Sequence, residues 1–73
     1  MLAMRYQFNT AAQAKQFMRA LRKNGILSEL VTKREVQIHA FELINELMKP
    51  LVLARANRAY NRILNEYEDT HKN

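Results

Sequence analysis

Residues 40–68 read AFELINELMKPLVLARANRAYNRILNEYE and include Pro50, the only proline of the chain. Apart from that proline, the whole stretch favours helix. Its apolar residues recur at helical spacing on both sides of Pro50, but the two stripes point about 160° apart around a helix axis. One straight helix therefore cannot bury both stripes against one core. The stripe before and just after the proline comprises Leu43, Ile44, Leu47, Met48 and Leu51, and the later one is centred on Tyr60, Ile63, Leu64 and Tyr67.

Two arrangements reconcile these stripes. In the first, Pro50 breaks the helix, because an interior proline loses a backbone donor and clashes with the preceding turn at a cost of about 3 kcal/mol. Residues 51–68 then fold back as a separate helix. In the second, the helix is kinked at Pro50, and its later half packs on another subunit. We favour the kinked helix, because residues 49–51 contain no Gly, Asn or Ser to form a reversal.

The later stripe also predicts how the chain gains stability. A 73-residue chain buries only about 60% of its unfolded surface, and this one has no cysteine for disulfides. We therefore expect a homodimer in which residues 41–70 form a C-terminal dimerisation helix. The alternative is an internal core with no partner. The expected contact residues are Leu51, Tyr60, Ile63, Leu64 and Tyr67.

The residues before this stretch predict a sheet and one helix. Residues 4–9 and 35–40 alternate apolar and polar side chains, which is typical of half-buried strands, and residues 26–32 read as a third strand. Between them, Thr10 is placed to cap a helix over 11–23 that ends at Gly25, the only glycine.

The sequence therefore predicts a single α+β domain over residues 1–73, with the order β-α-β-β-α. Residues 1–40 form a sheet-and-helix unit, and residues 41–70 form a long C-terminal helix that is kinked or broken at Pro50. The expected sheet is antiparallel, with its three strands in the spatial order first, third, second, and with helices on one face. This order resembles the front part of a ferredoxin-like split fold in topology only, so the resemblance implies no activity.

Positive charge is concentrated in the first half of the chain. The formal net charge is +5, and residues 1–34 hold seven cations but only one acid, Glu29. Lys15, Arg19 and Arg22 share one side of the predicted helix within an arc of about 60°. Together with Lys33 and Arg34 at the hairpin tip, they are candidates for salt-sensitive contacts with nucleic-acid phosphates. The alternative for these residues is an ordinary solvated helix face.

A second basic stripe, Arg55, Arg58 and Arg62, lies opposite the later apolar stripe. We interpret it as a solvated face with local pairs, and the alternative is a contact with a phosphate or an acidic protein.

Few residues are arranged for catalysis. His39 and His71 lie far apart in the sequence, and a single glycine cannot build a phosphate-binding loop. Glu42 and Glu46 stand one turn apart, which is typical of a solvated face as well as of an acid–base pair. We therefore expect no enzyme, no cofactor, no metal and no small-molecule substrate.

The cellular setting is predicted from what the chain lacks. No apolar run approaches the roughly 20 residues that span a bilayer, and the first residues lack the apolar core of a signal peptide. We therefore expect a cytoplasmic protein with no membrane contact. The leading expectation is a small non-enzymatic interaction or regulatory protein that binds itself or another protein. The alternative is an accessory protein that binds nucleic acid.

Overall fold

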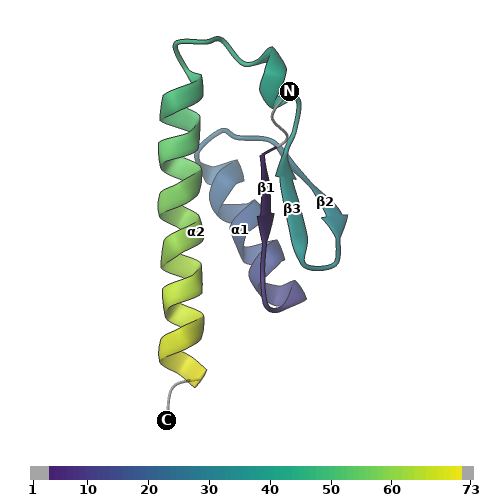
Figure 1. Cartoon of the computed structure of the whole chain (residues 1–73), viewed down its shortest axis with the longest axis vertical. Coiled ribbons are helices and arrows are strands. Elements are labelled where there is room, and N and C mark those ends of the chain that lie inside the picture. The colour runs from purple at the N-terminus through teal and green to yellow at the C-terminus, as the bar shows by residue number, and fades with distance from the viewer. Residues whose placement is uncertain (1–3, 72–73) are drawn as a thin grey trace.

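The computed structural model describes the backbone of residues 4–71 and the side chains of residues 4–67. It confirms the α+β class and the order of the elements (Figure 1). The elements are β1 (Arg5–Gln7), α1 (Ala11–Lys23), β2 (Ser28–Thr32), β3 (Glu35–Ile38), a 3₁₀ helix η1 (Phe41–Leu43) and α2 (Lys49–His71). The strands are shorter than expected at their ends.

The sheet has the predicted antiparallel order β1-β3-β2. Tyr6 of β1 lies opposite Val36 of the central strand, and both side chains are buried on the inner face. Arg5 lies opposite Gln37 on the outer face, where its Nε donates a hydrogen bond of 3.1 Å to the Gln37 side chain. The edge strand β2 carries a bulge after Leu30, which leaves that side chain about half exposed.

α1 begins and ends where the sequence predicts. The Thr10 hydroxyl accepts a hydrogen bond from the Gln13 N–H at 3.1 Å, and the Gln13 side chain accepts one from the Thr10 N–H at 3.2 Å. This reciprocal pair satisfies two backbone donors that the first turn of a helix leaves unpaired. Beyond the C-cap Asn24, Gly25 adopts a left-handed φ of 76°, which a residue without a Cβ tolerates.

The beginning of the last helix corrects the sequence prediction. We expected helix from about residue 40, with a kink or break at Pro50, but α2 begins at Lys49 and Pro50 lies in its first turn. A proline costs little there, because the first N–H groups of a helix have no intrahelical partner. Since the helix starts beside the proline, the favoured interior kink is not confirmed.

Asn45 makes the reversal that we did not find in residues 49–51. Its side-chain oxygen accepts a hydrogen bond from the Leu47 N–H at 2.8 Å, and its carbonyl accepts from the N–H groups of Met48 and Lys49. Such local bonds from an asparagine side chain compete with helix and favour a turn. Ala40 also turns the chain, with a left-handed φ of 48°. Residues 40–48 are therefore a connection, and the chain folds back into α2.

Both helices pack against the inner face of the sheet. The Tyr6 ring lies 4.9 Å from the Phe17 ring of α1 and 5.0 Å from the Tyr60 ring of α2, centroid to centroid. Phe8 contacts the same two rings at 5.1 Å. Figure 1 shows α2 beside α1, with η1 and the following connection at the end of the molecule opposite the β2–β3 turn. One layer of two helices therefore covers the sheet.

Candidate interaction surfaces

The side chains expected at a dimer contact lie mostly in the core of their own chain. Ile63 is 1% exposed, and Tyr60 packs on the aromatic rings of β1 and α1 while its hydroxyl donates a hydrogen bond of 2.9 Å to the Gln7 carbonyl. Leu64 packs against the same core, and Tyr67 is partly buried. Because α2 folds back, its later stripe packs on the sheet and α1 of its own chain, which leaves little of these side chains free for a contact with a second copy. Of the five residues, Leu51 alone is half exposed.

A different group of apolar side chains is exposed. They surround the connection between β3 and α2, and Leu43 and Leu47 are 81% and 84% exposed. A hollow of about 300 Å³ lies among them, lined in part by Ile44, Met48 and Val52. We call this surface the apolar end, and it comprises Leu27, Leu43, Leu47, Met48 and Leu51.

The charges around the apolar end are few and locally paired. Residues 39–54 contain the acids Glu42 and Glu46 and one cation, Lys49. The Lys49 ammonium lies 2.7 Å from the Glu46 carboxylate and 5.6 Å from the centre of the Phe41 ring. Residues 39–54 therefore lack the cationic excess of the rest of the chain, whereas Leu27 lines a pocket together with Arg19 and Arg22.

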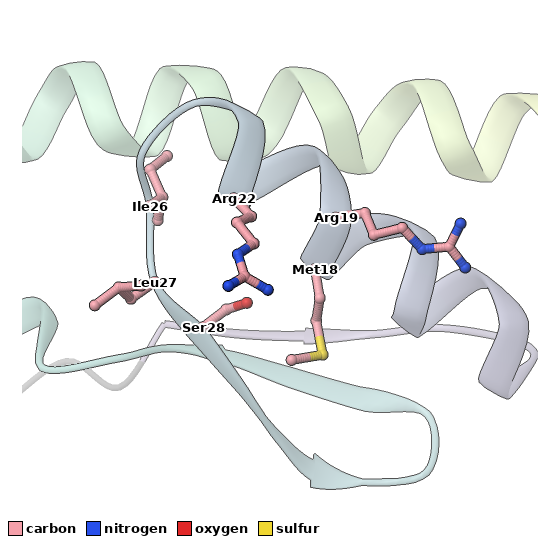
Figure 2. A pocket seen from close by; sticks show the side chains of 6 residues that line it. All are labelled: Met18, Arg19, Arg22, Ile26, Leu27 and Ser28. Atoms are coloured by element: carbon pink, nitrogen blue, oxygen red, sulfur yellow. The ribbon is translucent and has the colours of Figure 1, made fainter.

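The predicted phosphate-binding residues are exposed but do not form one cluster. Arg19 and Arg22 line a shallow pocket of about 170 Å³ between α1 and β2. Figure 2 shows Arg22 directed toward Ser28 of β2, whereas Arg19 extends away along α1. Lys33 and Arg34 lie at the β2–β3 turn, next to the strand that leads into α1, since the Phe8 N–H donates to the Arg34 carbonyl at 2.8 Å. Lys15 is exposed on α1.

The structure does bring cations together along the junction of the two helices. Two adjoining hollows of about 320 Å³ and about 90 Å³ lie there, and both contain Ala20, Asn24 and Arg62 in their lining. None of the cations that line these two hollows has an ion pair within the part of the chain whose side chains are described. We call this site the basic groove, and its cations are Arg19, Lys23, Arg55, Arg58 and Arg62.

The sequence indicated four of the five cations of the basic groove, but neither Lys23 as a candidate nor the groove itself. Helical spacing identified Arg55, Arg58 and Arg62 as one stripe, and Arg19 as part of another. Their proximity depends on α2 folding back beside α1, which the favoured kinked helix did not include. Asn45 is the residue that could have indicated the fold-back of α2, because a turn at Asn45 returns the chain to the sheet.

Groups suited to acid–base or metal chemistry are sparse. The His39 imidazole lies 3.5 Å from the Glu29 carboxylate at the surface, where more than half of each side chain is exposed. Among the described residues, no three His, Cys, Asp or Glu side chains are close enough to hold a metal ion. Burial raises the pKa of the Tyr6 phenol, with a smaller contribution from Tyr60, but its hydroxyl donates a hydrogen bond of 2.9 Å to the side chain of Asn57, an exposed residue of α2.

The suitability of the helices for a membrane and three comparisons with known proteins complete the description of the surfaces. In residues 4–71, no helix is long and apolar enough to cross a membrane. Searches with protein-family models, curated proteins and solved structures find no match to the chain. Any functional proposal therefore rests on the geometry of the apolar end and of the basic groove.

Proposed function

We propose that this chain is a small non-enzymatic interaction protein that acts through protein–protein contacts, as a homodimer held by the apolar end. One observation carries the proposal: Leu43 and Leu47 are each more than four-fifths exposed, beside an apolar hollow. Single exposed leucines are ordinary, but several exposed apolar side chains around one connection are typical of protein contact sites. These leucines thus support self-association at another place than Tyr60 and Ile63.

Electrostatics favours a second copy at this end. Two chains of net charge +5 repel each other wherever their cations meet. Around the apolar end, Lys49 is paired with Glu46, and Glu42 adds a further negative charge. Two copies related by a twofold axis can therefore join through Leu43, Leu47 and Leu51 with few cations at the contact, although Leu27 lines a pocket with Arg22.

The magnitude supports a dimer of modest affinity. The partial exposures of the five side chains amount to roughly three fully exposed ones per copy, hence about six per dimer. Burying each fully contributes about 1.5–3 kcal/mol, so the contact contributes about 9–18 kcal/mol. Association costs about 4–15 kcal/mol in lost freedom. The midpoints of the two ranges differ by about 4 kcal/mol, which corresponds to a dissociation constant of about 1 mM.

Analytical ultracentrifugation from about 20 μM to about 2 mM tests this proposal, because that range brackets a Kd of about 1 mM. We expect the mass to rise from 8.6 kDa toward twice that value. Leu43→Asp combined with Leu47→Asp should remain monomeric with unchanged helix content, since both side chains are exposed. The control is Ala12→Asp with Thr32→Asp, which adds the same charge at exposed positions away from the apolar end and should still dimerise. A wild type that stays monomeric throughout would refute the homodimer.

The second candidate function is nucleic-acid binding through phosphate contacts. The observation that favours it is that Lys15, Arg19, Arg22, Lys33 and Arg34 are all exposed and that none has an ion pair within the described side chains. Titration with mixed-sequence DNA and RNA at low and moderate salt tests it. We expect affinity that falls steeply with salt and that Lys15→Glu with Arg19→Glu weakens. Absence of binding at low salt would remove this candidate and leave the protein contact.

A further inference from the structure

We propose that the basic groove between α1 and α2 binds the phosphate backbone of one nucleic-acid strand. This inference rests on the second candidate function, and it moves the site from the α1 stripe and the hairpin tip to the junction of the helices. It assigns a role to Arg55, Arg58 and Arg62, which sequence reasoning interpreted as a solvated face.

The charge arrangement is the first argument. α1 contributes Arg19 and Lys23, α2 contributes three arginines, and no acidic side chain is among the residues that line the two hollows. Glu66 lies further along α2, where its carboxylate accepts a hydrogen bond from the Gln16 side chain at 3.4 Å. Folding does not require this concentration of like charge, because the five cations are exposed and are not part of the core cluster. A bound polyanion relieves the repulsion.

The residue types and their spacing favour phosphate. Four of the five cations are arginine, whose planar guanidinium donates two parallel hydrogen bonds to a phosphate. Arg55, Arg58 and Arg62 follow one another at helical rises of about 4.5 and 6 Å. The stripe is therefore about 10 Å long, so its three guanidinium groups can face successive positions along the backbone of one strand.

The floor of the groove fits a backbone rather than bases. Ala20 and Ala59 are small, so a sugar–phosphate chain can approach the helices closely. The Asn24 amide, which donates to the Ala20 carbonyl at 2.9 Å, adds a polar group at one end. No aromatic side chain lines either hollow, so bases have no ring on which to stack. We therefore expect binding with little sequence preference.

Fluorescence anisotropy with a labelled single-stranded DNA, measured over a range of salt, tests the site. If five cations each contact a phosphate, log K falls with log salt with a slope of about −3.5. Arg55→Gln with Arg58→Gln removes two contacts, so the slope should become about −2.1. The loss of these two phosphate contacts corresponds to about tenfold weaker binding at about 200 mM salt and about sixtyfold weaker binding at about 50 mM salt. Both arginines are exposed and glutamine has similar helix propensity, so circular dichroism should be unchanged.

A matched pair of single variants separates the groove from net charge. Arg58→Gln and Arg5→Gln each remove one exposed cation, but Arg5 lies on the outer face of the sheet. We expect the first to lower affinity and slope, and the second to leave both near the wild-type values. Equal effects of the two variants would refute the groove while leaving nucleic-acid binding intact. Wild-type protein that does not bind at low salt, or that binds polyglutamate as tightly as DNA, would refute the proposal as a whole.

Discussion

Replacing Ile63 by alanine should remove a large part of the stability of the monomer. Ile63 is 1% exposed and belongs to the core cluster between α2, α1 and the sheet. The change deletes three carbons, worth about 0.8 kcal/mol each in transfer free energy, and leaves a cavity whose lining loses contacts. The expected loss is about 2–5 kcal/mol. A domain of this length has about 4–11 kcal/mol in total, so the variant is close to unfolding.

Urea denaturation followed by circular dichroism measures this loss. A loss of about 3 kcal/mol lowers the melting temperature by about 12–24 °C in a domain of this size. Ile63→Val provides a graded control, because it deletes one carbon and should cost about 0.5–1.5 kcal/mol. Both variants should lose the same free energy at two protein concentrations about a hundredfold apart, since the contacts are within one chain. A cost below about 1 kcal/mol for Ile63→Ala would mean that Ile63 is not packed in the core of its own chain. A cost that grows with protein concentration would mean that Ile63 contacts a second copy instead.

Two further predictions concern the helix cap and a buried phenol. Thr10→Ala removes the hydroxyl that accepts from the Gln13 N–H and should cost about 1 kcal/mol, measured as a lower melting temperature that Thr10→Ser largely restores. Tyr6→Phe removes the hydrogen bond to Asn57 and should cost about 0.5–1.5 kcal/mol at neutral pH. Because burial raises the pKa of Tyr6 above 10.0, the folded state favours the neutral phenol, and wild-type stability should fall as the pH rises past 10. The difference in free energy of unfolding between the wild type and Tyr6→Phe, measured by urea titration, should therefore become smaller above that pH. A difference that stays constant with pH would contradict this account.

The elements that local chemistry determines were predicted well. α1 has a capping threonine, a glutamine three residues later and a glycine just beyond its end, and each signal acts within a few residues. The alternation around Val36 and Ile38 likewise assigns these side chains to the buried face, and the short hairpin makes the β2–β3 pairing antiparallel. The sheet order then follows from connection lengths.

The connection over residues 40–48 was not predicted, because its helical pattern is misleading. Leu43, Leu47 and Met48 recur at helical spacing, yet the side chain of Asn45 bonds the backbone two residues ahead and the chain turns. Periodicity alone does not distinguish a helix from an exposed connection whose apolar residues recur at the same interval. The local hydrogen bond of Asn45 competes with helix and favours the turn. Pro50 is tolerated in the first turn of α2, so the helix begins at Lys49.

The position of Pro50 determines both proposed surfaces. The two apolar stripes of residues 40–68 point about 160° apart only when they are drawn on one continuous helix. Because α2 begins at Lys49 instead, Ile63 and its neighbours are covered by the sheet, and the leucines before the helix are left exposed at the apolar end. The same reversal lays the arginines of α2 beside Arg19 and Lys23, which creates the basic groove. The proposed dimer contact and the proposed strand contact therefore use different residues, so a copy bound at the apolar end would leave the cations of the groove available to phosphate.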